Sequence, residues 1–480
     1  MSSETPAEPH AAPKTAVVMI HGMGEQWPMD TLRGFVDATW TTDATLVRPG
    51  PNQPYFKPDT ITGSFELRRV TTRPWSGTGG RRVDYFEFYW AHMMRDTGIG
   101  DVVGWMMRLL LRAPSRVPRR LLGGWLAGLL VCAVAVILAI LTQLEPEQRP
   151  VDWPWFVWTL IAAGGALFSA LWLRPVAGDA ARYLSPTPGN VAARQEIREA
   201  GIDLLTKLHQ TGDYDRIVVA GHSLGSVVGY DVLNYAWGRI DHDALLAGHP
   251  DGGAAMAALD VLEEKASELV MTGSRDALAV WRDAQRAYFA ELSRLTGSDG
   301  KPLWLVSDFV TMGSPLSKAD VLLARDEGDL KRRKGRREAP TCPPWLEGKR
   351  PPRFSYPPKN PNRTPHHAAV FGPTVWTNIY YPNILGAIGD FISGPVAPQL
   401  GPGIRDVRVP IGLPTFRHLS YWANPERLQP AILALRRALN LRLVDERALW
   451  HDQADENPVR AETLERPDRD ALPGPEEADE

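Results

Sequence analysis

One short segment limits the possible folds of this 480-residue chain more than any other: Gly221-His222-Ser223-Leu224-Gly225. The apolar run Ile217–Ala220 before it predicts a buried strand, and the pattern Ser226–Trp237 after it predicts a helix. Glycines on either side permit a tight turn between the two that exposes the serine hydroxyl. The start of the helix also favours negative charge that develops beside it. Ser223 is therefore the predicted nucleophile.

Short apolar runs that alternate with helical patterns extend this unit to an α/β fold. Besides 226–237, a helix is predicted at Ala192–Leu208. Such alternation is typical of a mostly parallel sheet that carries helices on both faces. The predicted strands are Thr15–Ile20, Val83–Trp90, Arg216–Ala220, Leu303–Thr311, Thr374–Tyr381 and Asp406–Ile411.

The segment 221–225 resembles the nucleophile elbow of the α/β-hydrolase superfamily in its lipase-like form, GHSLG. After the first predicted strand, residues 21–25 (HGMGE) are similar to the oxyanion loop of lipases and esterases. The resemblance covers the sheet segments, somewhat over half of the chain, and implies an α/β-hydrolase fold with serine esterase or lipase-like activity. It also implies that the backbone N–H groups of Met23 and Leu224 hold the oxyanion. The supporting motif residues are His21, Gly22, Gly221 and Gly225.

A serine nucleophile needs a base, and the order in the family is serine, acid, histidine. His418 follows the last predicted strand, in a segment that resembles the H-x-x-Y-W segment of some lipase-like relatives. His366 and His367 lie in a Pro-rich insert before a strand and are poorer candidates. His222 is expected to point away from the nucleophile and to be structural.

The acid is predicted to be Asp390. It follows the strand that ends in 376–381, and this region resembles a W-x-N-x-Y strand with a D-x-I/V segment, where relatives place the acid of the triad. Asp308, within a predicted strand, and Asp406, at the start of the last one, are alternatives.

Two long runs without a charged residue predict a membrane hairpin inserted into the α/β domain. Leu121–Leu144 has 24 residues and Trp153–Leu173 has 21, and either can cross a hydrocarbon core of roughly 30 Å as a helix. Tryptophans stand near the ends of both runs, where indoles favour the membrane interface. The preceding segment Trp105–Arg112 is predicted to be an amphipathic helix on the membrane surface.

The placement of arginines predicts the orientation of this hairpin. Arginines are concentrated before the first run and after the second, whereas the connecting segment Glu145–Asp152 holds one arginine and three acids. Because positive flanks stay inside, both flanks and the hydrolase domain are expected in the cytoplasm. We therefore expect a protein of a bacterial-type inner membrane, with the lipid bilayer as its partner and a lipid-like ester as its substrate.

The domain organisation that follows is a hydrolase domain at 15–104 and 183–458, interrupted by the membrane hairpin at 105–182. Residues 1–14 and the acidic tail 459–480 are expected to be disordered. Within the domain, 241–298 predicts a helical insert or cap, and 324–365 predicts a Pro-rich insert with the basic run 331–337. A solvated, mobile loop is the favoured interpretation of that run, and contact with anionic lipid headgroups is the alternative.

Composition excludes other classes of protein. The 53 basic and 56 acidic residues nearly balance, so no nucleic-acid partner is indicated. Cys132 and Cys342 are the two cysteines; they predict neither a disulfide nor a zinc site. No phosphate-binding loop, dinucleotide fingerprint or metal-ligand cluster is present, so no cofactor and no metal are expected.

The predicted function is hydrolysis of carboxylic esters by a membrane-anchored serine hydrolase, through Ser223, His418 and Asp390. Two alternatives stay open. One is a non-catalytic membrane scaffold or binding protein on the same fold. The other is an acyltransferase that uses the same triad.

Overall fold

The computed structural model describes most of the chain. The described residues are 14–23, 27–46, 53–74, 80–94, 107, 110–143, 157, 183–184, 188–240, 249, 252–297, 300–348, 351–357, 363–384, 388–412, 415–427 and 429–450. The segments expected to be disordered lie outside these residues, apart from Lys14, which begins the first strand.

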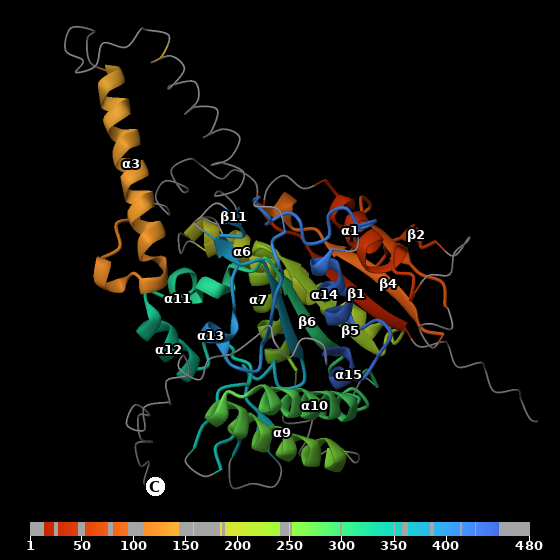
Figure 1. Ribbon diagram of the computed structural model, residues 1–480. Helices are drawn as coiled ribbons and strands as arrows, with labels where there is room; N and C mark the ends of the chain where they lie inside the picture. Colours follow the sequence, from red (N-terminus) through yellow and green to blue (C-terminus); the bar gives the residue numbers. More distant parts are fainter. Residues whose placement is uncertain are drawn as a thin grey trace, which may run out of the picture.

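An eight-stranded, mostly parallel sheet forms the centre of the molecule, in the order β12-β9-β6-β5-β1-β4-β3-β2 (Figure 1). The strands from β12 to β4 are all parallel, and the hairpin β2–β3 adds an antiparallel edge. The six predicted strands are confirmed, and with them the mostly parallel α/β class. The bounds are β1 (Lys14–Ile20), β2 (Tyr55–Pro58), β3 (Arg68–Thr71), β4 (Arg82–Phe88), β5 (Arg216–His222), β6 (Val306–Met312), β9 (Val375–Tyr380) and β12 (Arg405–Arg408).

Each face of the sheet carries its own hydrophobic core. In β1, Val18 and Ile20 join the core that includes residues of α6 (Pro188–Gln210) and α7 (Leu224–Gly238). Val17 and Met19 point to the other face and pack with residues of α1 (Asp30–Val36) and α14 (Pro430–Leu439). Alternate residues of a strand face opposite sides, so the continuous apolar run is explained by burial on both faces.

The predicted helical insert is an antiparallel pair, α9 (Gly252–Thr272) and α10 (Arg275–Leu292), at the lower end of the sheet in Figure 1. From α10, Arg282 donates hydrogen bonds to the carbonyl of Trp376 and the hydroxyl of Thr377 at the beginning of β9, both at 3.0 Å. The pair therefore lies at the amino ends of the strands. It is not a cap over Ser223, which follows the carboxyl end of β5.

The basic run 331–337 differs from the expected mobile loop, because most of it lies in helix α12 (Glu327–Gly335). Asp326 caps this helix by accepting the Asp329 N–H at 2.8 Å. Acidic residues in its first turn and basic ones in its last turn match the helix dipole. Beyond the helix, Arg337 forms a two-pronged ion pair with Glu347. The helical propensity of Lys and Arg, with a good cap, decides the conformation here.

The first predicted membrane run is a single helix, α3 (Leu122–Gln143), which projects from the body of the molecule (Figure 1). No helix in the described part of the chain is long and apolar enough to cross a membrane. The connecting segment 145–152 and the second run lie outside the described residues, except for Val157. The hairpin is thus not supported by the structure. The segment 105–112 is likewise described only in part.

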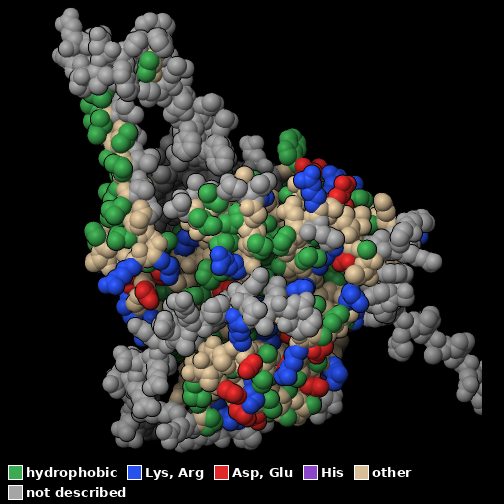
Figure 2. All heavy atoms as spheres, viewed as in Figure 1, with side chains coloured by type: hydrophobic (Ala, Val, Ile, Leu, Met, Phe, Trp, Pro, Cys, Tyr) green, Lys and Arg blue, Asp and Glu red, His purple; other side chains and the backbone are tan. Residues whose placement is uncertain are grey.

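The foot of α3 is attached to the α/β body. Arg120 donates to a carboxylate oxygen of Asp320 at 2.6 Å, in α11 (Ala319–Leu322), and Arg112 donates to the Val321 carbonyl at 3.0 Å. Figure 2 shows hydrophobic side chains along α3 and a group of Lys and Arg side chains near its foot. Exposed apolar residues of α3 include Leu126, Leu130, Val134, Val136, Ile137 and Ile140.

The remaining elements are short and serve as connections. They are η1 (Asp37–Thr41), η3 (Ala91–Met93), η4 (Pro114–Arg116), η5 (Arg119–Leu121), η8 (Pro315–Lys318), β7 (Ser355–Tyr356), β8 (Thr364–Pro365), β10 (Asn383–Ile384), β11 (Ile388–Gly389), α13 (Ala397–Leu400) and α15 (Glu446–Trp450).

Candidate active site

Ser223 stands between β5 and α7, at the carboxyl edge of the parallel strands. Its φ of 52° and ψ of −128° are unusual for a residue with a side chain, and such strain is typical of functional turns. Its N–H donates to the Met312 carbonyl at the end of β6, at 2.9 Å. After β1 the chain goes to the edge strand β2, comes back inward through β3 to β4 beside β1, and then crosses to β5 on the other side of β1. The serine therefore lies where the strand order reverses, the usual location of sites in open α/β sheets.

Two glycines allow the segments around Ser223 to approach one another. A Cβ on Gly225 would collide with the carbonyl oxygens of Ile20 and His21, so the start of α7 lies against the end of β1. A Cβ on Gly22 would come within 3.0 Å of the Ser223 Cβ. The loop after β1 and the serine turn are thus in direct contact.

His418 lies within hydrogen-bond distance of the serine. Its Nε2 is 2.8 Å from the Ser223 hydroxyl oxygen, and its Nδ1 is 2.9 Å from an oxygen of Asp390. All three side chains are buried. His222, the neighbour of the serine, places a ring nitrogen 2.9 Å from the His418 carbonyl oxygen and thereby holds the backbone of that residue. Burial lowers the pKa of His222 to about 3, so its ring is neutral.

Asp390 is held as a carboxylate. Burial by itself would raise its pKa, but hydrogen bonds from His418, Tyr421 and Ser393 bring the pKa down to about 2. Tyr421 donates to the same oxygen as His418, at 2.9 Å, while the backbone N–H of Ile392 donates to the other oxygen at 2.9 Å. Since the carboxylate can only accept, His418 Nδ1 carries the ring proton. Nε2 is then left to accept from the serine hydroxyl.

The two alternative acids have other partners. Asp308 forms ion pairs with Arg216 at 2.6 Å and with Arg286 at 2.5 Å, near the amino end of β6. Asp406 accepts hydrogen bonds from Asn378 and from the N–H groups of Val396 and Ala397. Both carboxylates are therefore engaged in holding neighbouring elements together.

The alternative histidines are likewise engaged elsewhere. His366 Nδ1 accepts the Ala368 N–H at 3.1 Å, and its Nε2 lies 3.3 Å from the Trp345 carbonyl oxygen. The ring of His367 lies against that of His366. Neither residue is in contact with the serine in the described structure, and His418 occupies the position beside its hydroxyl.

One predicted oxyanion donor, Leu224, directly follows Ser223, and the other, Met23, lies in the loop after β1 that contacts the serine turn. Leu224 is the first residue of α7, a position where the backbone N–H has no partner within the helix. Met23 follows Gly22, whose contact with the serine turn is described above, and is half-buried. His21 organises this loop: it stacks on Trp90 at 5.1 Å, and its Nε2 accepts the Trp90 N–H at 3.1 Å. Burial lowers the pKa of His21 to about 4, which suits an uncharged structural residue.

Sequence reasoning missed two residues of the site. Gly313 has a φ of 62°, and a Cβ there would come within 2.9 Å of the Tyr421 ring and 3.2 Å of both Asp390 and His418. The sequence identifies Tyr421 only as the tyrosine of the H-x-x-Y-W segment and gives it no role, although its hydroxyl donates to Asp390. The signal for Gly313 was the segment 311–315 after β6, where a glycine follows a buried strand on the same edge of the sheet.

Neither a metal site in the described residues nor a match to a known protein adds to the chemistry of these side chains. Among the described residues, no group of three or more His, Cys, Asp or Glu side chains is arranged to hold a metal ion. No family model, no curated protein and no solved structure matches the chain.

Proposed function

We propose that the protein is a serine hydrolase that cleaves carboxylic esters, of the lipase and esterase type in the α/β-hydrolase superfamily. The observation that carries the proposal is the continuous line of hydrogen-bonded groups Ser223–His418–Asp390, with distances of 2.8 and 2.9 Å. A nucleophile, a base and an orienting acid in this geometry are what acyl transfer requires.

In the proposed reaction, the Ser223 oxygen attacks the ester carbonyl carbon while His418 Nε2 takes the hydroxyl proton. The N–H groups of Met23 and Leu224 would stabilise the oxyanion, and Asp390 would stabilise the charged imidazole. Collapse breaks the bond to the alcohol, which leaves with the proton from His418. Water then attacks the acyl-enzyme and gives a proton to His418; the bond between the acyl carbon and the Ser223 oxygen breaks, the serine oxygen takes that proton back from His418, and the carboxylic acid is released.

A short-chain p-nitrophenyl ester assay tests this proposal. Wild-type protein should release nitrophenol, and Ser223→Ala should lose the activity while keeping its fold. Ser226→Ala is a matched control, because the Ser226 hydroxyl contacts the Ser223 carbonyl and Ser314 rather than His418. Full activity in Ser223→Ala would refute the nucleophile. Inactive wild-type protein that also fails to react with serine-directed inhibitors would favour the scaffold alternative.

Acyl transfer to an alcohol uses the same residues and is distinguished by its products. With an added alcohol acceptor, an acyltransferase would form a new ester in preference to the free acid. We propose hydrolysis as the main reaction, so the free acid should dominate.

We further propose that the ester is lipid-like and that the enzyme acts at the cytoplasmic face of a bacterial-type inner membrane, held there by the segment 105–182. Phe391 and Leu419, which adjoin the proposed acid and base, are exposed, and so is the apolar surface of α3. Element η8 lies beside the foot of α3, and its Lys318 donates a hydrogen bond to the Ile392 carbonyl at 2.6 Å. Ile392 is two residues from Asp390. A membrane at α3 would therefore lie near the site, and α12 offers basic side chains to anionic lipids.

Vesicle binding and activity test the membrane proposal. Leu130→Asp and Ile137→Asp on α3 should weaken binding to lipid vesicles, whereas Val261→Asp, at a position on α9 that is also at least half exposed, should not. Reporter fusions at the C-terminus and within 145–152 should report opposite sides of the membrane. Activity should rise with acyl length and with presentation in vesicles. A preference for short soluble esters, unchanged by vesicles, would end the lipid part of the proposal.

A further inference from the structure

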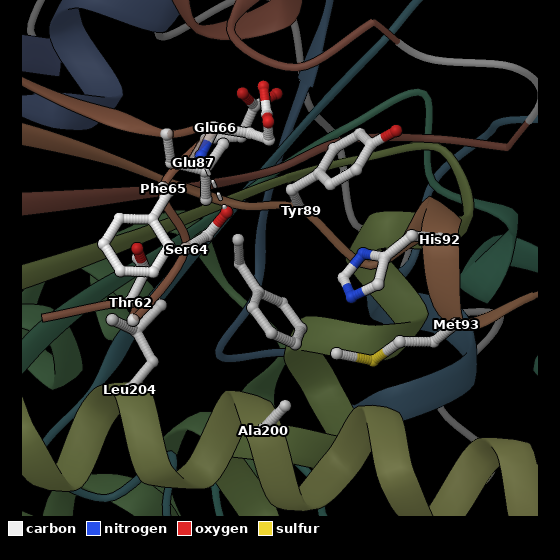
Figure 3. A pocket seen from close by; sticks show the side chains of 13 residues that line it. Thr62, Ser64, Phe65, Glu66, Glu87, Tyr89, His92, Met93, Ala200 and Leu204 are labelled. Carbon is white, nitrogen blue, oxygen red and sulfur yellow. Dashed lines mark hydrogen bonds between the residues drawn. The ribbon is translucent and has the colours of Figure 1, made fainter.

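A charged side chain that the proposed reaction does not use lies beside the proposed acid. It is Lys318, the last residue of η8, which contacts the turn that follows Asp390. The cavity of about 560 Å³ beside β4 is a separate feature, since none of its lining residues in the described structure belongs to the triad (Figure 3). The contacts of Lys318 indicate what the lysine does for the site.

The Lys318 ammonium is partly buried and faces the backbone of this turn. Its Nζ donates to the Ile392 carbonyl at 2.6 Å and lies 3.3 Å from both the Ser393 carbonyl oxygen and the Ser317 hydroxyl. An ammonium has three N–H donors, so these neutral oxygens use all of them. Removing an ammonium from water is costly, and three directed hydrogen bonds offset part of that cost.

The same turn orients the Asp390 carboxylate. The backbone N–H groups of Ile392 and Ser393 donate to its Oδ1 at 2.9 and 3.2 Å, while Oδ2 receives His418 Nδ1. The Ile392 carbonyl and the Ser393 N–H belong to one planar peptide unit. Lys318 therefore fixes one side of this peptide while the other side donates to the acid.

The element η8 is close to both catalytic turns. It follows β6, whose last residue, Met312, accepts the Ser223 N–H at 2.9 Å. On the acid side, a Cβ on Gly394 would come within 3.3 Å of the Ser317 Cβ, so η8 and the chain after the acid turn are closely packed. A side chain at the end of η8 can thus hold the acid at a fixed distance from the serine.

We propose that Lys318 is a positioning residue of the active site, an inference that rests on the proposed function: its ammonium fixes the turn after Asp390 so that the carboxylate faces His418. Its positive charge also attracts that carboxylate. Lys318 acts on the reaction only through the acid, and it exchanges no proton with the ester.

A double-mutant cycle, measured as p-nitrophenyl ester hydrolysis by the full-length protein, tests this role. Lys318→Met keeps an unbranched chain of similar length but removes the charge and the donors. Its kcat per folded molecule should fall about tenfold to a hundredfold, with KM within about threefold of wild type. Because Lys318 acts through the acid, the same change made in Asp390→Asn should lower kcat by less than about twofold more. A general structural defect would instead reduce kcat equally in both backgrounds.

Lys334→Met is the matched control. Lys334 is also partly buried, its pKa is also lowered by burial, and it also donates to a backbone carbonyl, that of Gln399, at 2.9 Å. Its loss should lower the thermal midpoint but leave kcat within about threefold of wild type. Lys318→Arg keeps the charge and N–H donors, so its kcat should be at least about threefold above that of Lys318→Met. This rescue keeps the proposal testable if Lys318→Met is unstable.

The dependence of kcat on pH gives a second readout. Burial lowers the pKa of Lys318 to about 8, and Asp390 acts in the opposite direction. The other charged groups that face it are Arg120, which also lowers the pKa, and Asp320, which raises it. The ammonium therefore predominates below about pH 8 and is lost above it. The kcat of the wild type should decline on this alkaline side, whereas that of Lys318→Arg, whose guanidinium does not titrate there, should stay level.

The outcomes separate this role from the proposed function. A wild-type protein without esterase activity would overturn the hydrolase and the role of Lys318 together. With an active wild type, the role of Lys318 alone would be overturned if Lys318→Met lost no more kcat than Lys334→Met. It would also be overturned if the loss were equally large in Asp390→Asn, or if Lys318→Arg showed the same alkaline decline as the wild type.

Discussion

Replacing Asp390 by asparagine tests the proposed role of the acid most sharply. The carboxylate accepts from His418 Nδ1 at 2.9 Å and has a pKa of about 2, so it is charged throughout the neutral range. An asparagine offers an N–H in one orientation, which favours the histidine tautomer with its proton on Nε2. That tautomer cannot take the serine proton. If the proposed role is right, kcat should fall about 10⁴-fold, as the same change does in serine hydrolases, which is equivalent to about 5 kcal/mol of transition-state stabilisation.

Asp308→Asn is the contrasting change, because it removes a buried carboxylate that has no contact with His418. Asp308 sits between Arg216 and Arg286, and removing one partner of such a buried cluster costs about 3–5 kcal/mol of folding stability. Its kcat per folded molecule should remain within about threefold of wild type.

The assay measures kcat on a p-nitrophenyl ester for each variant, with the folded fraction taken from circular dichroism. The thermal midpoint should fall strongly in Asp308→Asn. If Asp390→Asn keeps kcat within about tenfold of wild type while Asp308→Asn loses 10⁴-fold, the assignment of the acid is wrong.

Three further changes have defined outcomes. Gly313→Ala should lower kcat at least about tenfold, on the order of a 1.4 kcal/mol loss, with little change in KM. The reason is that the added Cβ meets the Tyr421 ring at 2.9 Å and that the positive φ adds about 1 kcal/mol of strain. Kinetics equal to those of the wild type would contradict the packing of the site. Asp326→Ala should lower folding stability in urea by about 0.5–2 kcal/mol by removing the cap on the Asp329 N–H, and an unchanged midpoint would show that the cap is unimportant. Glu87 has a pKa raised from 4.5 to about 7 by burial, so the carboxylate progressively destabilises the wild-type fold as the pH rises between these values, and the effect is complete above them. Glu87→Gln should therefore gain up to about 3 kcal/mol relative to wild type between pH 4.5 and 8 in urea unfolding, and a difference that does not change with pH would refute the raised pKa.

The sequence predicted the parts of the fold that depend on local pattern. The six parallel strands are apolar runs buried on both faces, and the turn at Ser223 is encoded by neighbouring residues. Positions for His418 and Asp390 came from resemblance, and the structure brings both side chains to the serine. Their assignment to catalytic roles remains a prediction.

The parts that were missed depend on tertiary packing. The edge hairpin β2–β3 has strands of four residues each, too short for a clear periodic signal. The sequence predicted a helical insert at 241–298, and α9 and α10 lie within it, but their position at the amino ends of the strands is set by long-range contacts such as Arg282 with Trp376. Gly313 lies far in sequence from the triad residues that pack around it, so no local pattern links them.

Covalent labelling of Ser223 by a fluorophosphonate tests the central proposal most directly, because the reagent reacts with a serine only when its base is in place. Intact-mass and peptide analysis of the full-length protein should find one adduct per chain, on the peptide that holds Ser223. Labelling should be lost in His418→Ala and after heat denaturation. An unlabelled native protein, or an adduct on a different serine that persists in Ser223→Ala, would contradict the assignment of Ser223 as the nucleophile.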